Sequence, residues 1–268
     1  MFILRYTRHR NMFYQTIQYI KFLLKSTNQH GVHSPFVYNL VTQCFYNKTY
    51  YKAYDHIISY KKQLLENKTK IKVLDLGAGS HTMKHQERYI SDMAKHAGST
   101  NKSAKMLYRF INYYKPSNIL ELGTSLGIAT HAMSLGHPKA KITTIEGCPN
   151  ISQFTKTVFN KNGLENINII TGEFNTIIKT LQPANQNLVF FDGNHQKEAT
   201  LNYFEALLTS TNNDSIFIFD DIHWSKGMTE AWDIIKQHPK VTVTIDTFYW
   251  GFVFFRKEQA KEHFTIRI

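Results

Sequence analysis

The segment 118–127, NILELGTSLG, constrains the fold of this chain more than any other. It begins as a short, mainly apolar run that ends in Glu121 and Leu122, which is typical of a buried strand. Gly123 and Gly127 then allow a tight turn in which the backbone can approach a ligand closely. We expect a helix to begin at about Leu126, so that unpaired N–H groups at its start face the same place.

A second strand is expected over 141–146, and it also ends in an acid, Glu146. A carboxylate at the end of this strand can accept hydrogen bonds from both hydroxyls of a ribose. The pattern therefore predicts a nucleoside-cofactor site made of Glu121, Gly123, Thr124, Ser125, Gly127 and Glu146.

From residue 117 onward, apolar strands alternate with helical patterns. The expected strands are 118–122, 141–146, 166–171, 187–192, 215–220, 241–246 and 251–256, and the expected helices are 126–136, 151–162, 175–181, 197–209 and 226–237. This alternation predicts an α/β fold with a Rossmann-like, doubly wound, seven-stranded sheet that is mostly parallel. The connection between the last two strands is of hairpin length, so the strand near the C-terminus should be antiparallel.

Residues 1–100 read as a basic, mainly helical extension that precedes a domain of residues 101–268. Helices are expected over 11–25, after Pro35, over 53–66 and over 103–114. The helix over 11–25 carries an apolar stripe formed by Phe13, Ile17, Ile20 and Leu24. This stripe fits three partners, namely a membrane surface, the helix's own domain, or a partner subunit in a homodimer.

Charge and composition limit the classes of protein. Residues 1–70 hold 11 Lys and Arg against 2 Asp and Glu, whereas the whole chain has a net charge of +12. This excess suits either a solvated helical face or a nucleic-acid-binding surface. The chain has two cysteines, no apolar run long enough to cross a bilayer and no signal-like start, so the expected location is the cytoplasm.

Carboxylates end two further strands, at Asp192 and at the pair Asp220 and Asp221. Because the carboxyl ends of parallel strands share one edge of a sheet, the three acids should converge and repel one another. Mg²⁺ or another divalent cation would relieve this repulsion, and the alternative is a helix cap and a direct substrate contact without metal. His195, three residues after Asp192, could take a proton from a hydroxyl group or bond a neighbouring loop.

Several other patterns carry less weight. The glycine-rich stretch 71–80 is read as a strand-like or loop element, because no helical face follows it. His81 and His85 have the spacing of a zinc pair but lack further ligands. The aromatic residues Trp224, Tyr249 and Trp250, with Met228, could wall a substrate pocket, whereas Trp232 is expected in the core.

Together these motifs resemble the class I S-adenosylmethionine (SAM)-dependent methyltransferases over residues 103–256. The nearest likeness is to metal-assisted O-methyltransferases of the catechol and caffeoyl-CoA type, and to related sugar O-methyltransferases. The resemblance implies that 121–127 is the loop that binds the methionine end of SAM and that Glu146 binds the ribose. It further implies that Gly172, Glu173 and Phe174 contact adenine, that Asp192 lies beside the cofactor, and that Asp192, Asp220 and Asp221 are metal ligands.

Two features depart from the catechol type. Asp221 stands where an amide is usual, and His195 stands where that type has a lysine base. Metal use is therefore left open.

The predicted function is SAM-dependent O-methylation of a small hydroxylated acceptor, with Asp192 and His195 as the catalytic residues. An enzyme that methylates RNA on a ribose or a hydroxyuridine is one alternative, because the N-terminal region is basic. A non-catalytic binding or membrane-associated module that keeps the fold is another. A NAD-dependent dehydrogenase is less favoured, since it would prefer a fuller glycine pattern and no antiparallel strand.

Overall fold

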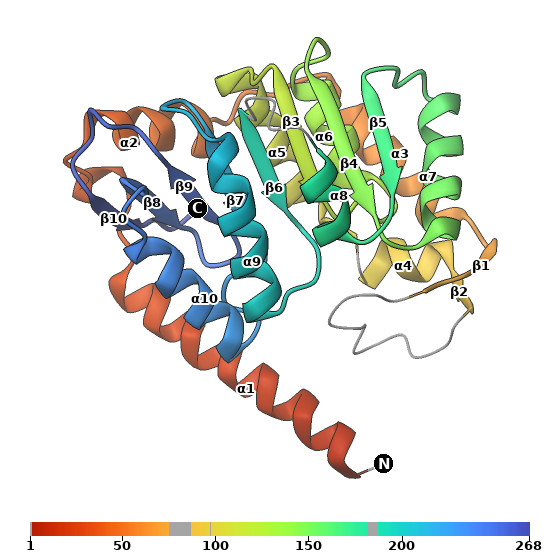
Figure 1. Ribbon diagram of the computed structural model, residues 1–268, viewed down its shortest axis with the longest axis horizontal. Coiled ribbons are helices and arrows are strands. Elements are labelled where there is room, and N and C mark those ends of the chain that lie inside the picture. Colours follow the sequence, from red (N-terminus) through yellow and green to blue (C-terminus); the bar gives the residue numbers. More distant parts are fainter. Residues whose placement is uncertain (1, 75–86, 97, 182–186) are drawn as a thin grey trace. The chain divides into compact units, whose positions relative to one another are not determined.

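The computed structural model describes residues 2–74, 87–96, 98–181 and 187–268, with side chains from Phe13 onward (Figure 1). The chain divides into two compact units. One, here called the central unit, is Leu40–Gln182, and the other, the terminal unit, combines Met1–Asn39 with Pro183–Ile268. These units follow contacts in space, so the expected sequence domains 1–100 and 101–268 remain a prediction.

Three parallel strands form the sheet of the central unit, in the order β3-β4-β5. Their bounds are Asn118–Leu122 for β3, Lys141–Glu146 for β4 and Ile167–Thr171 for β5. The first two coincide with the expected ranges, and the third begins one residue later. Figure 1 shows the three strands side by side.

Helices connect and cover these strands. They are α3 (Ala53–Glu66), α4 (Ile90–His96), α5 (Asn101–Tyr114), α6 (Ile128–Gly136), α7 (Pro149–Lys161) and α8 (Phe174–Thr180), with a short π-helical turn, η2 (Val41–Phe45), before them. Local sequence explains where two of them begin. Thr100 caps α5 by accepting a hydrogen bond from the Ser103 N–H, and α7 begins at Pro149, which has no N–H to leave unpaired.

Helix α3 supports the loop between β3 and α6, although sequence analysis placed it in a separate extension. Tyr54, Ile57, Tyr60 and Leu64 are buried in one cluster with residues of α6 and α7. The Tyr60 hydroxyl donates a hydrogen bond of 2.8 Å to the carbonyl oxygen of Leu126. Residues of the expected extension therefore help to build the predicted cofactor loop.

A small antiparallel ribbon completes the central unit. Strand β1 (Lys70–Lys72) pairs with β2 (Glu87–Tyr89). The strand-like reading of 71–80 thus holds at its start, whereas Gly77, Gly79, His81 and His85 lie outside the described residues.

The terminal unit has five strands in the order β10-β8-β9-β7-β6. They are β6 (Leu188–Phe191), β7 (Ile216–Phe219), β8 (Val243–Asp246), β9 (Gly251–Phe254) and β10 (Glu262–Thr265). β6 and β7 are parallel, and β9 runs antiparallel to both β7 and β8, which confirms the expected antiparallel strand.

The expected fold class is confirmed. Apart from the β1–β2 ribbon, the described residues form eight strands, one more than the seven predicted. The additional strand, β10, pairs in parallel with β8. Its sequence, Glu-His-Phe-Thr, has one apolar residue, because an edge strand buries little of its surface.

The helices of the terminal unit are α1 (Phe2–Lys25), α2 (Pro35–Leu40), α9 (Lys197–Leu207) and α10 (Lys226–Gln237), with two short 3-10 turns, η1 (Gln29–Gly31) and η3 (Leu208–Ser210). Helix α1 begins nine residues before the expected start at 11. Ser225 caps α10 by accepting from the Met228 N–H. Across the described part of the chain, no helix is both long and apolar enough to cross a membrane.

Candidate functional site

The loop after β3 is formed by residues with left-handed backbone angles. Gly123, Ser125 and Gly127 have φ values of 109°, 47° and 73°. A Cβ on Gly127 would lie 2.3 Å from Cζ of Phe159 on α7. Gly127 is therefore required both for the turn and for close packing where α6 begins.

Glu146, at the end of β4, bonds this loop through one carboxylate oxygen and the start of α7 through the other. Oε2 accepts the Ser125 N–H at 2.8 Å, and Oε1 accepts the Cys148 N–H at 2.9 Å. A carboxylate accepts hydrogen bonds from N–H and O–H donors at about four positions. The donor and acceptor chemistry of this site thus fits the hydroxyl groups of a nucleoside.

Glu121, in β3 just before the loop, is fully buried. Its side chain is 0% exposed, and Oε2 accepts hydrogen bonds from the hydroxyls of Thr130 (2.5 Å) and Thr144 (2.6 Å). Its other oxygen, Oε1, is buried and has no partner among the described residues. Burial raises the pKa of Glu121 to about 8, although the two hydroxyl groups oppose the shift.

The residues expected at adenine lie next to Glu146. The Gly172 N–H, directly after β5, donates to the Glu146 carbonyl oxygen at 3.0 Å. Glu173 caps α8 by accepting from the Thr176 N–H at 2.9 Å, and Phe174 is half-buried. The central unit therefore brings Glu121, the 123–127 loop, Glu146 and residues 172–174 to one end of its strands, and we call this set the central site.

In the terminal unit, the structure groups Asp192, His195 and Asp220 at the ends of β6 and β7. One potential ligand atom from each lies within 4.8 Å of the others. His195 Nε2 is 4.0 Å from Asp192 Oδ1. The Trp250 indole N–H donates to Asp220 Oδ1 at 2.6 Å and so fixes that carboxylate. Two carboxylates and an imidazole are a donor set that suits a divalent transition metal such as Mn²⁺.

His195 lies in the turn after β6. The preceding residue, Asn194, is left-handed, with φ of 50°, and its amide donates to the Tyr203 hydroxyl at 2.9 Å. Burial lowers the pKa of His195, although the charge of Asp220 opposes this shift. The neutral imidazole is thereby favoured, and this form can accept a proton or bind a metal.

Asp221, the third expected metal ligand, is not part of this group. It has a left-handed backbone, with φ of 54°, and lines a neighbouring pocket. Burial and the charge of Asp220 together raise the pKa of Asp221.

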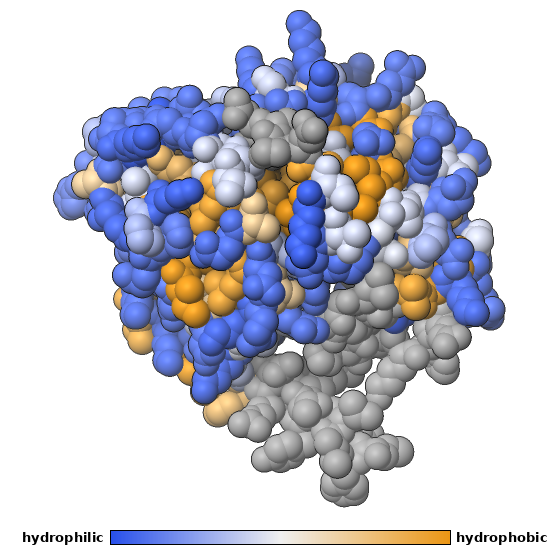
Figure 2. Space-filling view, in the orientation of Figure 1, coloured by the Kyte–Doolittle hydropathy of each residue, from blue (hydrophilic) through white to orange (hydrophobic). Residues whose placement is uncertain are grey.

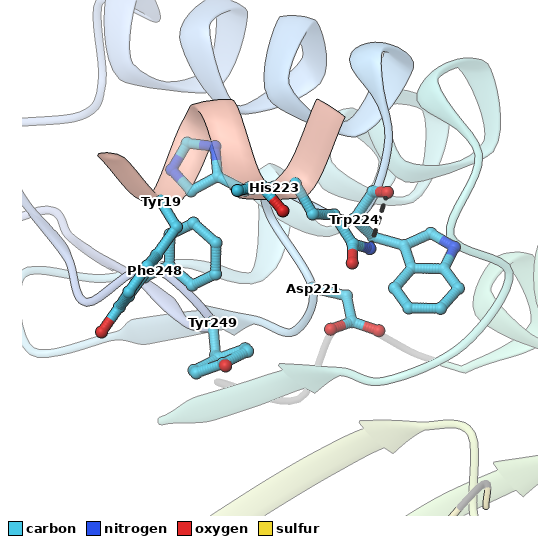
Figure 3. Close-up of a pocket in the computed structure, with 8 residues that line it drawn as sticks. Tyr19, Asp221, His223, Trp224, Phe248 and Tyr249 are labelled. Carbon is cyan, nitrogen blue, oxygen red and sulfur yellow. Dashed lines mark hydrogen bonds between the residues drawn. The ribbon is translucent and has the colours of Figure 1, made fainter. Parts of the chain in front are cut away.

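The pocket has a volume of about 320 Å³ (Figure 3). In this view the Asp221 carboxylate lies between the side chains of Tyr249 and Trp224. The lining residues are Gln15, Thr16, Tyr19, Asp221, His223, Trp224, Phe248 and Tyr249. This pocket and the Asp192–His195–Asp220 group are here called the terminal site.

The structure also separates the aromatic residues expected at a pocket. Trp224 and Tyr249 line it, whereas Trp250 and Met228 are buried and do not. Trp232 is buried in the core, as expected.

Sequence analysis missed His223 and Asp246. His223 Nε2 lies 2.8 Å from Asp246 Oδ2, and His223 Nδ1 lies 3.2 Å from the Thr229 hydroxyl, so both ring nitrogens have partners. His223 could have been found from its position, two residues after Asp221 at the end of a strand. Asp246, which ends β8, gave a second indication.

Comparisons with known proteins agree with this architecture. Residues 120–222 match a family model described as a methyltransferase domain. No curated protein matches the chain.

Solved structures match the fold at low sequence identity. A methyltransferase of Podospora anserina with SAH bound has a TM-score of 0.58 and 15% identity, over 84% of this chain and 97% of that one. The O-methyltransferase TomG of Streptomyces achromogenes, involved in tomaymycin synthesis and solved with SAM, has a TM-score of 0.55 and 14% identity, over 78% of this chain and 91% of that one. An O-methyltransferase of Bacillus cereus in complex with SAH has a TM-score of 0.54 and 13% identity, over 80% of this chain and 98% of that one.

Proposed function

We propose that the chain transfers the methyl group of SAM to a hydroxyl oxygen of a small acceptor, because residues 120–222 match a model described as a methyltransferase domain and the fold is similar to that of a methyltransferase solved with SAH. The observation that carries this proposal is the position of Glu146, whose carboxylate accepts one N–H from the 123–127 loop and another from Cys148 at the start of α7. That arrangement presents a fixed carboxylate and the start of α6 at the end of a strand, as a nucleoside cofactor requires.

Each residue of the central site has a distinct part in this proposal. Glu146 would accept the ribose hydroxyls, and the backbone of the 123–127 loop would bind the methionine end. Glu121 would act from within, because its contacts to Thr130 and Thr144 hold β3 against α6 and β4. When bound, SAM supplies a sulfonium methyl group that is ready for in-line displacement.

Asp192, His195 and Asp220 would hold a divalent metal in the terminal site. Such a metal lowers the pKa of a bound hydroxyl group and fixes its position. Trp250 keeps Asp220 in place through its indole N–H. His195 is either a nitrogen ligand or the base that takes the acceptor's proton, and its lowered pKa favours the neutral imidazole that both roles require.

The pocket supports an aromatic or otherwise flat hydroxylated acceptor. Tyr19, Trp224, Phe248 and Tyr249 supply apolar surface, and Asp221 is among the polar residues of the lining and can bond a hydroxyl. An apolar lining with few polar groups is typical of small-molecule sites. The RNA-directed alternative rests on the basic charge of residues 1–70.

Calorimetry with SAM tests the cofactor assignment. We expect the wild-type chain to bind SAM and Glu146→Ala to bind it at least about 30-fold more weakly, because hydrogen bonds to a charged group contribute about 1.5–3 kcal/mol. Glu165→Ala, which removes an exposed glutamate from the same unit, should bind as the wild type does. Glu146→Gln tests the charge if the alanine variant is unstable. Absence of SAM binding by the folded wild-type chain would refute the proposal and favour a non-catalytic module.

The same measurement with Mn²⁺ and Mg²⁺ tests the metal. We expect Mn²⁺ to bind more tightly than Mg²⁺, since imidazole suits transition metals. Asp192→Asn should abolish this metal binding. Equal metal affinity of wild type and Asp192→Asn would remove the metal from the proposal.

A further inference from the structure

Helix α1 packs onto the terminal unit through one side only. Gln15 Nε2 donates to the Trp224 carbonyl oxygen at 3.1 Å. The rings of Tyr19 and Phe22 pack on Phe248, with centroids 4.8 and 5.6 Å away. Gln15, Tyr19 and Phe22 are four and three residues apart, so they share one face of the helix, here called the inner face.

The apolar stripe identified from sequence lies on the other side. Phe13, Ile20 and Leu24 are 68%, 52% and 83% exposed, and Ile17 is half-buried. Phe13 and Ile20 each precede an inner residue by two positions, which is about 200° around an α-helix. The stripe therefore faces away from the unit, and packing on its own domain does not explain it.

This exposure is unusual for a protein surface. Figure 2 shows that hydrophilic residues cover much of the visible face. Contiguous apolar patches on such surfaces mark contacts with proteins or membranes. The four stripe residues are spaced by four, three and four positions, so the stripe suits either a bilayer surface or the seam of a coiled coil with a second copy.

Charge distinguishes these two partners. The sequence of α1 contains Arg5, Arg8, Arg10, Lys21 and Lys25 and no acidic residue. Pairing with a second copy would bring two sets of positive charges together without compensation, which is unfavourable. An anionic bilayer would compensate them. Lys21 and Lys25 are exposed and directly follow Ile20 and Leu24, so they can reach phosphate groups beside the buried stripe.

We propose that the outer stripe of α1, formed by Phe13, Ile17, Ile20 and Leu24, binds the surface of a bilayer that contains anionic lipids, with Lys21 and Lys25 contacting the head groups. The helix lies in the interface and does not span the bilayer. Because Tyr19 of the same helix lines the pocket, this contact anchors one wall of the pocket at the membrane. The proposal does not depend on methyl transfer.

Vesicle co-sedimentation of the full chain tests it. We expect binding to vesicles of phosphatidylcholine and phosphatidylglycerol in equal parts, weak binding to phosphatidylcholine alone, and loss of binding as salt is added. Ile20→Glu should weaken binding at least about tenfold, because it removes a buried apolar side chain. Ile58→Glu, which changes an exposed isoleucine of α3 in the central unit, should bind as the wild type does.

A second variant and a second measurement keep the test decisive. Lys21→Gln with Lys25→Gln leaves the apolar stripe intact and should weaken binding about fivefold per lysine. Absence of wild-type binding to the anionic vesicles, or equal binding by Ile20→Glu, overturns the proposal. So does a wild-type dimer in gel filtration that Ile20→Glu converts to monomer, since the stripe is then a subunit interface.

Discussion

The central and terminal sites are held in place by different kinds of contact. In the central site, the carboxylates of Glu121 and Glu146 bond buried hydroxyls and backbone N–H groups of neighbouring elements. In the terminal site, Asp192 and His195 have side chains that are each 23% exposed and 4.0 Å apart. The geometry of the central site is therefore part of the fold itself. The geometry of the terminal group depends on contacts between side chains, such as the bond from Trp250 to Asp220.

The largest effect on stability is expected at Gly127 in the central site, where the backbone leaves no room for a side chain. Gly127→Ala should lower the free energy of unfolding by about 2–4 kcal/mol, because it combines a left-handed φ with a contact against Phe159. Gly163→Ala is the control, since Gly163 has φ of +66° and nothing within 4 Å of an added Cβ. It should lose only about 1 kcal/mol. Urea unfolding measures both, and equal losses would mean that the loop adjusts to the added methyl group.

The next effect concerns the pH dependence of stability. Burial raises the pKa of Glu121 from 4.5 to about 8, so the folded chain binds a proton that the unfolded chain releases over this range. The stabilisation is therefore complete below pH 4.5 and is lost as the pH rises towards 8.

Glu121→Gln should remove this part of the decline. Urea unfolding of the variant and the wild type, followed from pH 5 to pH 9, compares the two slopes. If the slopes are the same, Glu121 is not the group that titrates.

The smallest changes in stability are expected for two tyrosines, one that supports the loop of the central site and one that lines the pocket of the terminal site. Tyr60→Phe should cost about 1–2 kcal/mol, because the buried Leu126 carbonyl loses its hydrogen bond. Tyr249→Ala, at a residue that is 66% exposed, should cost no more than about 0.5 kcal/mol, and on the proposed function it weakens acceptor binding. Thermal unfolding measures the stabilities. A larger loss for Tyr249→Ala would show that the pocket wall is also structural.

Much of the fold could be predicted because local patterns and tertiary structure agree. β3, β4, α3 and α10 have the expected bounds, since each has an apolar pattern of the right period and a clear start or end. β10 was missed because it is short and mostly polar. The contact of Tyr60 with Leu126 could not be foreseen, because it joins segments 66 residues apart in the chain.

The candidate site could likewise be predicted only where its residues follow one another in the sequence. Glu146 and the loop could be found because a strand, a turn and a helix follow one another in sequence. The grouping of His195 with Asp192 and Asp220, in place of Asp221, depends on the left-handed turn at Asp221, which no pattern in the sequence requires. The pocket draws on α1, the loop after β7 and the turn before β9, and only the final packing brings these segments together.

The hydrogen bond between Trp250 and Asp220 gives the terminal site an optical property. An indole emits at a wavelength that depends on the electric field across its ring. Its N–H bonds the carboxylate that belongs to the Asp192–His195–Asp220 group, so any change of charge there acts on the emission of Trp250. Of the three tryptophans in the chain, Trp250 is the one whose indole N–H donates to Asp220. The protein thus contains an intrinsic fluorophore positioned to report, without a label, on what binds to Asp220.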